Sequence, residues 1–267
     1  MTATRIRLGV TLWPQHTTYA SLRAAWRQLE ALGVETLWTW DHFFPLSGDP
    51  NGAHFECWTT LAGMAEVTER VEIGALVSAI GYRNPALLSQ MAKTVDHMSA
   101  GRLILGLGAG WSERDYREYG YEYGTAKERL AALREGLQII RDRWQVDLPP
   151  PLRNPIPIMI GGGGEQVTLR LAAQYAQLWN GGDTDAATFA RKNRVLDERC
   201  REIGRDPATI ERVARADPPG LGSLPSTPAG FDALREAGAQ QIIMRLGEPW
   251  DFAVVERLVA WRENTQG

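Results

Sequence analysis

The chain has 267 residues, a length that suits one large domain or two small ones. Its 44% hydrophobic and 23% charged residues match a globular protein with a sizeable core, which excludes the collagen-like, disordered and peptide-scaffold classes. The formal net charge of −3 removes the main electrostatic reason to expect nucleic acid or an anionic membrane as a partner.

Cysteine usage and hydropathy narrow the class further. The two cysteines, Cys57 and Cys200, form no Cys-x-x-Cys pair and no cluster of metal-ligand spacing, so we expect neither a disulfide framework nor a metal site. The first residues lack the apolar region of a signal peptide, and no stretch of about 18 apolar residues is present to span a bilayer. We therefore expect a cytoplasmic protein that does not enter a membrane.

Short apolar or β-branched runs alternate with amphipathic helical stretches along the whole chain, a pattern typical of a parallel sheet with crossover helices. Eight strands are predicted, at residues 6–13, 34–40, 71–79, 103–108, 156–160, 178–180, 210–214 and 240–246. The helices between them have recognisable ends. The first follows one buried stripe up to Gly33, a left-handed stop residue.

Capping residues predict the starts of three later helices. Asn84 followed by Pro85 begins the helix after the third strand, and Thr125 with Glu128 forms a capping box for the helix after the fourth. Thr227 precedes a helix that ends at Gly238, and the last helix is expected over about residues 250–261.

Eight β/α units in this length average roughly 33 residues each, close to the size of an eight-stranded barrel. We therefore predict a (β/α)8 TIM barrel, with residues 1–267 as a single domain. The rival, an open doubly wound sheet, needs a glycine fingerprint after its first strand, and residues 12–16 contain no glycine. Residues 217–228 are predicted to form one long loop, either a lid or a plain surface loop.

In such a barrel, chemistry is built where the strands end. The second strand ends in Asp41 and His42 among aromatic residues, so His42 is a candidate for catalysis or for a hydrogen bond to the next loop. The third strand ends in small residues, which admit a flat ligand or form a tight corner. The fourth ends in alternating glycines before Trp111, more glycine than a bulge requires.

Four consecutive glycines, Gly161, Gly162, Gly163 and Gly164, separate the fifth strand from its helix. Backbone N–H groups exposed there, near the positive end of a helix dipole, predict a cradle for a phosphate. The run matches neither a Walker A loop nor Gly-x-Gly-x-x-Gly, and a flexible turn is the alternative. Asn180 and two further glycines end the neighbouring strand. Together with His42, the aromatic residues and the small residues at the other strand ends, the turn predicts a slot for a flat phosphorylated cofactor.

Several segments taken in order give a more specific indication. The chain resembles the luciferase-like monooxygenase superfamily of TIM barrels that use flavin or deazaflavin, and most closely its branch that uses coenzyme F420. The resemblance covers nearly the whole chain, and it is carried by residues 38–43 (Trp-Thr-Trp-Asp-His-Phe), 55–61, 73–78 with Arg83-Asn84-Pro85, 94–97 with Gly101-Arg102, 106–111, 160–164, and Trp179-Asn180.

The resemblance implies a hydride carrier lying across the barrel mouth. Its phosphate would be held by the glycines at 161–164, and its ring would rest against Val77 and Ser78, where such enzymes often have a non-proline cis peptide bond. The remaining contacts to the cofactor would come from Asp41, Ala109, Gly110, Trp111 and Asn180. His42 matches the active-site histidine of the deazaflavin enzymes and would be the acid/base, since imidazole exchanges protons near neutral pH.

The chain also departs from the sugar-phosphate and alcohol dehydrogenase relatives. Trp111 takes the place of their glutamate after the fourth strand, with Glu113 two residues further on, and Leu46 replaces a tryptophan that shapes their pocket. The segment 144–157 is shorter than its counterpart. The substrate pocket is expected among Trp13, His16, Leu46 and His54, but the sequence names no substrate.

The leading hypothesis is therefore an F420-dependent oxidoreductase that moves a hydride to or from a small organic molecule. One alternative is a reduced-FMN-dependent monooxygenase using the same slot, and another is a non-catalytic barrel that only binds the cofactor. Because relatives are often dimers, we also expect a homodimer.

Overall fold

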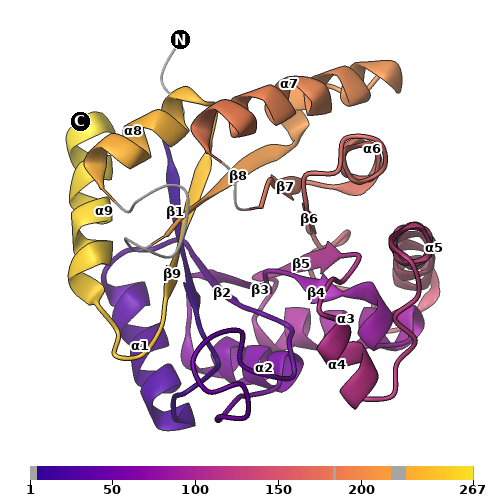
Figure 1. Cartoon of the computed structure of the whole chain (residues 1–267), viewed down its shortest axis with the longest axis horizontal. Helices are drawn as coiled ribbons and strands as arrows, with labels where there is room; N and C mark the ends of the chain where they lie inside the picture. Colours follow the sequence, from indigo (N-terminus) through magenta and orange to yellow (C-terminus); the bar gives the residue numbers. More distant parts are fainter. Residues whose placement is uncertain (1–4, 183–184, 218–226, 267) are drawn as a thin grey trace.

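The structure, a computed structural model, describes residues 5–182, 185–217 and 227–266. Its nine parallel strands follow the order β3-β2-β1-β9-β8-β7-β6-β5-β4, and β3 also pairs with β5, which closes the sheet into a barrel (Figure 1). The strands are β1 (Arg7–Leu12), β2 (Thr36–Thr39), β3 (Glu72–Ala75), β4 (Ser78–Ala79), β5 (Leu103–Gly108), β6 (Ile158–Gly161), β7 (Leu178–Asn180), β8 (Glu211–Ala216) and β9 (Gln241–Leu246). Both β3 and β4 lie within the predicted third strand, so the predicted eight-stranded barrel is confirmed.

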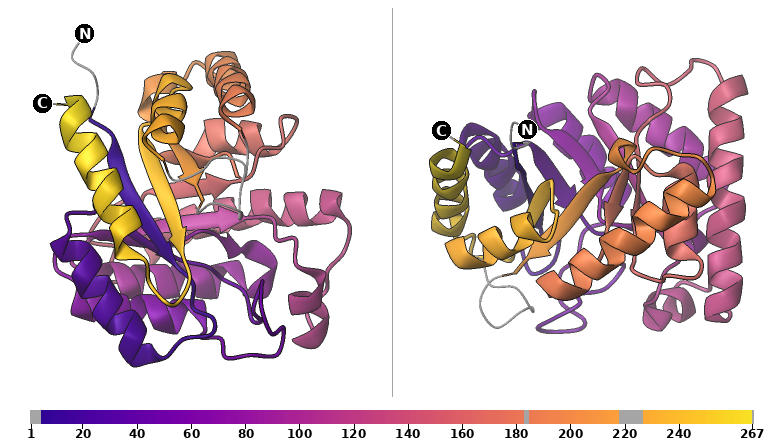
Figure 2. Two further views of the ribbon diagram at one scale, coloured as in Figure 1. Left: turned by 60° about the vertical axis from the view of Figure 1, so that its left-hand side comes forward. Right: turned by 90° about the horizontal axis from the view of Figure 1, so that it is seen from above.

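Helices surround the strands on the outside of the barrel (Figure 2). They are α1 (Tyr19–Ala31), α2 (Cys57–Val67), α3 (Pro85–Met98), α4 (Glu113–Glu118), α5 (Ala126–Val146), α6 (Thr168–Tyr175), α7 (Ala186–Glu202), α8 (Pro228–Glu236) and α9 (Phe252–Gln266). Over the residues that the structure describes, none of these helices is long and apolar enough to cross a membrane.

The predicted helix starts agree with the structure. The Asn84 side chain accepts hydrogen bonds from the backbone N–H groups of the first turn of α3, with Pro85 in that turn. Thr125 and Glu128 form the complete capping box of α5, and Thr227 caps α8. Such caps satisfy N–H groups that have no partner inside the helix, so short-range sequence signals suffice to locate them.

The structure differs from the prediction in three elements. The short helix α4 was not expected, and α9 continues to Gln266 rather than ending near residue 261. The predicted third strand is interrupted by a non-proline cis peptide bond between Leu76 and Val77, which is the kind of bond that the resemblance implied beside Val77 and Ser78, so that β4 pairs with β5 further along the barrel. Within the predicted loop 217–228, residues 218–226 lie outside the described residues.

The core has two layers. A large apolar cluster fills the space between the strands and the helices. A smaller cluster lies inside the barrel, formed by Trp38, Ile104, Met159, Leu178, Val213 and Ile243. Trp38 is fully buried and donates its indole N–H to Thr36 Oγ1 at 2.8 Å. Because these side chains fill the interior of the barrel, a ligand is expected at the C-terminal ends of the strands, among the loops that follow them.

Candidate active site

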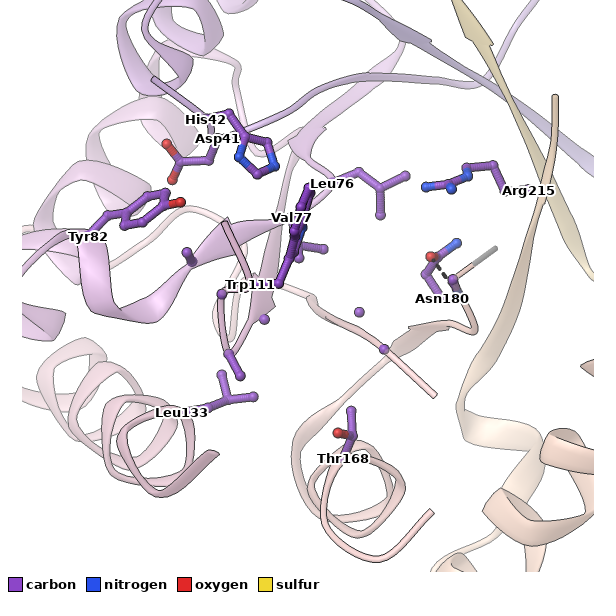
Figure 3. A pocket seen from close by; sticks show the side chains of 17 residues that line it. Asp41, His42, Leu76, Val77, Tyr82, Trp111, Leu133, Thr168, Asn180 and Arg215 are labelled. Atoms are coloured by element: carbon purple, nitrogen blue, oxygen red, sulfur yellow. Dashed lines mark hydrogen bonds between the residues drawn. The ribbon is translucent and has the colours of Figure 1, made fainter. Parts of the chain in front are cut away.

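A cavity of about 360 Å³ lies at the C-terminal ends of the strands, within the size range of small-molecule sites (Figure 3). Residues from the strand ends and loops of β2 to β8, together with one residue each of α5 and α6, line it: Asp41, His42, Leu76, Val77, Ala79, Tyr82, Gly108, Ala109, Gly110, Trp111, Leu133, Gly161, Gly162, Thr168, Asn180, Gly182 and Arg215. The sequence-predicted residues at 41, 42, 77, 109–111, 161, 162 and 180 therefore share one cavity.

Val77 explains why glycines end the neighbouring strands. A Cβ atom added to Gly108 would lie 2.7 Å from Val77 Cγ2, and one added to Gly161 would lie 2.9 Å from Val77 Cγ1. A Cβ on Gly106 would meet the carbonyl oxygen of Ala75. These glycines therefore give room to the chain around the cis bond, a use of that space that the sequence did not indicate.

Ser78 holds the same turn from behind. Its hydroxyl accepts a hydrogen bond from Trp58 Nε1 at 3.0 Å, and the residue is fully buried and does not line the cavity. A substituent placed in the slot would meet Val77 rather than Ser78.

The glycine run forms the far end of the slot, beside the N-terminal end of α6. The carbonyl oxygen of Asn180 accepts a hydrogen bond from Gly162 N–H at 3.0 Å, and the indole N–H of Trp179 donates to Gly162 O at 2.9 Å, which fixes this turn. A Cβ on Gly164 would lie 2.9 Å from Thr168 Oγ1. Of the four glycines, Gly161 and Gly162 line the cavity, and Gly163 and Gly164 continue the turn beside it.

Lys192 adds a positive charge to this turn. Its Nζ atom and last methylene lie against Gly163, so that any side chain at that position would collide with them. Backbone N–H groups, a helix N-terminus and an ammonium group at one turn form a site suited to an anion.

His42 is held by a carboxylate that the sequence analysis did not single out. His42 Nδ1 lies 2.6 Å from Asp115 Oδ2, and the same oxygen accepts a hydrogen bond from the Tyr82 hydroxyl at 2.8 Å. The other oxygen of Asp115 accepts from the backbone N–H of Phe43 at 3.2 Å. Asp115 lies on α4, so the unexpected helix supplies the partner of the predicted histidine.

The pKa values of this group follow from its contacts. Burial alone would raise the pKa of Asp115, but the hydrogen bonds from His42, Tyr82 and Phe43 hold that pKa below its ordinary value. Burial and the neighbouring Asp115 raise the pKa of Tyr82. The carboxylate is therefore ionised and the phenol protonated at neutral pH, so Nδ1 carries the proton that His42 donates to Asp115.

Trp111 covers His42 from the open side. The two rings meet edge to face with centroids 5.2 Å apart, and 65% of Trp111 is exposed. Glu113, the first residue of α4, is exposed and lines no part of the cavity. No carboxylate thus stands at the position of Trp111, and the acid nearest the histidine is Asp115.

Asp41 is a cavity residue with a structural partner. Arg83 donates two hydrogen bonds to its carboxylate, at 2.5 and 3.0 Å, and a third to Glu56 at 2.7 Å. Burial raises the pKa of Asp41, and the Arg83 guanidinium opposes that shift. Because both oxygens accept from Arg83, Asp41 anchors the loop after β2 and so fixes the position of His42.

The four residues predicted for the substrate pocket lie in different surroundings. Leu46 lines a second cavity of about 180 Å³ beside His42 and Trp111. Trp13 packs against Trp40 with ring centroids 5.5 Å apart, and His16 lies 2.8 Å from the carbonyl oxygen of Ser47. His54 accepts a hydrogen bond from Trp40 Nε1 at 3.0 Å. These last three side chains line neither cavity.

The neutral state of His54 gives a prediction about stability. Burial, with a contribution from His42, lowers the pKa of His54 from 6.5 to about 4. The unfolded chain therefore binds more protons than the folded one between these values, so the free energy of unfolding falls as the pH drops through this window, by about 2 kcal/mol after allowance for partial exposure.

We expect His54→Gln, which keeps an acceptor for Trp40, to lose much of this pH dependence. Urea unfolding midpoints of both proteins at about pH 7 and about pH 4.5 measure the effect. An equal loss of stability in both proteins would contradict the assignment.

Arg83, Lys192 and Arg215 are further residues of the site that were not predicted from the sequence. Arg83 belongs to a motif that carried the resemblance, so the sequence indicated that this residue matters but not that it binds Asp41. Lys192 and Arg215 lie on α7 and β8, in segments that show no motif. The closed barrel brings Arg215 to the cavity and Lys192 to Gly163 beside it.

Comparison with known proteins places this geometry in a family. The profile of the luciferase-like monooxygenase family matches residues 2–218. The chain belongs to this family. It is 37% identical over 187 residues to an F420-dependent glucose-6-phosphate dehydrogenase of Kribbella flavida, an alignment that covers 64% of this chain and 53% of that protein. The chain spans about half the length of the curated relatives that it matches.

Solved structures share the fold. An F420-dependent secondary alcohol dehydrogenase in complex with an F420-acetone adduct superposes with a TM-score of 0.82 at 17% identity, over 96% of this chain and 98% of that one. A coenzyme F420-dependent tetrahydromethanopterin reductase from Methanopyrus kandleri gives a TM-score of 0.77 at 16% identity, over 98% and 100% of the two chains.

Proposed function

We propose that this member of the luciferase-like monooxygenase family is an F420-dependent oxidoreductase that exchanges a hydride with a small organic substrate. The observation that carries the proposal is the pairing of His42 with the buried carboxylate of Asp115 at the edge of a slot whose far end is the glycine turn beside Lys192. The F420-dependent dehydrogenases to which the chain is similar support the choice of cofactor.

The residues present fit such a cofactor. Lys192 and Thr168 occupy the space that side chains at Gly163 and Gly164 would need, so an anion at this turn would meet backbone N–H groups and the ammonium group. The phosphate would bind there. The ring would lie over Val77 near Ala109 and Gly110, which line the slot between the turn and His42.

When bound, the deazaflavin supplies a carbon that accepts or releases a hydride. The chain supplies the rest. Asp115 fixes His42 with its proton on Nδ1, which leaves Nε2 to accept a proton from substrate or return it. Asp41 and Arg83 hold the backbone beneath the histidine, and the exposed ring of Trp111 limits access of water to it. This arrangement provides one acid/base group beside a flat binding slot.

A reduced-FMN-dependent monooxygenase is the second candidate, because the same turn would hold the phosphate of FMN and the ring of Trp111, not a carboxylate, faces His42 at the cavity. Fluorescence titration of the purified protein with F420 and with FMN tests the proposal. We expect F420 to bind at least ten times more tightly than FMN. Binding of FMN without binding of F420, or turnover that consumes oxygen, would favour the monooxygenase.

Lys192 gives a prediction for cofactor affinity. Because its ammonium group lies against Gly163, Lys192→Gln is expected to weaken F420 binding by about five- to tenfold at low salt, with a smaller difference at high salt. Lys127→Gln, on α5, removes an equal charge from an exposed position and serves as the control. Equal affinities of the two variants would show that the ammonium group does not contact the anion.

A further inference from the structure

A further cavity, here called the outer cavity, lies outside the barrel where α6 meets α5 and α7. Figure 1 shows α6 between these two helices. The volume of the outer cavity is about 240 Å³. Each of the three helices contributes to its lining, which includes Arg134, Val167, Arg170, Leu171, Arg199 and Glu202. None of these residues has a part in the site described above.

Positive charge predominates in the outer cavity. Glu202 is the acid among its lining residues, and it accepts hydrogen bonds from Arg170 Nη1 at 3.0 Å and from Arg199 Nη1. The Arg134 guanidinium has no hydrogen bond or ion pair within the described part of the chain. Three arginines against one glutamate leave an excess of two positive charges. The cavity is therefore suited to an anion.

Arg199 provides an independent indication of a ligand. Its side chain is 17% exposed, and its Nε atom is buried. Over the residues that the structure describes, this Nε–H group has no hydrogen-bond partner. A buried donor without a partner is costly, and an oxygen atom of a ligand in the outer cavity would satisfy it.

The outer cavity is a neighbour of the cofactor slot. Leu133 of α5 and Thr168 of α6 line the slot, and Figure 3 shows both on the side away from His42. The residues next to them in the sequence, Arg134 and Val167, line the outer cavity. The two cavities therefore adjoin at the contact between α5 and the start of α6, beside the glycine turn.

Apolar side chains complete the lining. Val167, Leu171 and Ile203 lie among the arginines, so the outer cavity offers methylene groups a surface as well as offering charge to an anion. Carboxylates spaced along a short aliphatic chain match this combination, because the acids would meet guanidinium groups and the chain would pack on the apolar side chains.

We propose that the outer cavity binds the carboxylate-bearing end of the cofactor. The side chain of F420 continues beyond its phosphate into lactate and a chain of γ-linked glutamates, which carries the chemistry described above. One carboxylate of this chain meets Arg134 and the Arg199 Nε–H group, and another meets Arg170. The identity of the ligand rests on the proposed function. Because FMN ends at its phosphate, the outer cavity would favour F420 over FMN.

Fluorescence titration of the full chain with two forms of F420 tests this site. One form carries three glutamates, and the other ends at the lactate. We expect the glutamate form to bind about five- to twentyfold more tightly at low salt, with a smaller difference at high salt. Arg134→Gln combined with Arg170→Gln should remove most of this difference and leave the affinity for the short form unchanged. Glu202→Gln, which removes the opposing charge, should increase the difference about two- to threefold.

Controls separate this proposal from the cofactor assignment. Arg27→Gln removes the same charge at an exposed position of α1 and should change neither affinity. If the double variant does not fold, Arg134→Gln alone, at an exposed position, provides the comparison. Equal binding of the two forms, or an undiminished difference in the variant, would overturn this proposal and leave the proposed function intact. Binding of neither form would overturn the proposed function and this proposal with it.

Discussion

His42→Ala is expected to lower turnover by about 10²- to 10⁴-fold while F420 affinity changes little, because general acid/base groups contribute rate factors of this size. Turnover is followed by F420 absorbance with the best substrate from a panel of small acids and alcohols. The side chain forms one edge of the slot, whereas the anion-binding turn lies at its far end. Unchanged turnover would instead support a barrel that only binds its cofactor.

Asp115→Asn separates positioning from catalysis at the same histidine. The ionised carboxylate stabilises a protonated imidazole, so its loss should displace the pH profile of kcat/KM toward lower pH. A merely structural role for Asp115 would reduce the rate without displacing this profile. A pH profile at the same position in both proteins would therefore contradict the role assigned to Asp115.

Gly162→Asp is expected to have the second largest effect, a loss of F420 affinity of at least a hundredfold beyond that of Gly162→Asn. Gly162 has a φ of +120° and lines the cavity, so both variants share the same backbone strain and nearly the same bulk. Only the aspartate adds a negative charge beside the phosphate, which costs about 3 to 4 kcal/mol at about 4 to 5 Å. Equilibrium titration by fluorescence measures both affinities.

Two controls accompany this comparison, one at high salt concentration and one with the same substitution at a distant glycine. The difference between Gly162→Asp and Gly162→Asn should shrink as salt screens the repulsion. Gly204→Asp introduces the same residue at another positive φ, +71°, at the exposed end of α7. It should not change the affinity. Equal affinities of Gly162→Asp and Gly162→Asn would show that the phosphate binds elsewhere.

The barrel and the starts of three of its helices could be predicted because their signals are local. The caps at Asn84, Thr125 and Thr227 act within one helical turn, and short apolar or β-branched runs identified the strands. The break in the third strand did not follow from this pattern, because small residues at 75–79 are compatible with a continuous strand. The family resemblance indicated it, and the packing of Val77 against Gly108 and Gly161 shows which neighbours accommodate it.

The candidate site could be predicted in part for the same reason. His42 and the glycine turn follow directly after buried strands, and TIM barrels build their active sites at these strand ends, so position along the chain was enough to predict them. Asp115 lies 73 residues from His42, and its role depends on the unexpected helix α4.

A crystal structure of the protein with F420 bound tests the central claim most directly. We expect phosphate oxygens within hydrogen-bond distance of Lys192 and of backbone N–H groups at 161–164 other than that of Gly162, which bonds Asn180, with the ring over Val77 and its reactive carbon on the side of His42. A phosphate bound at another edge of the barrel, or a His42 ring directed away from the cofactor, would contradict it.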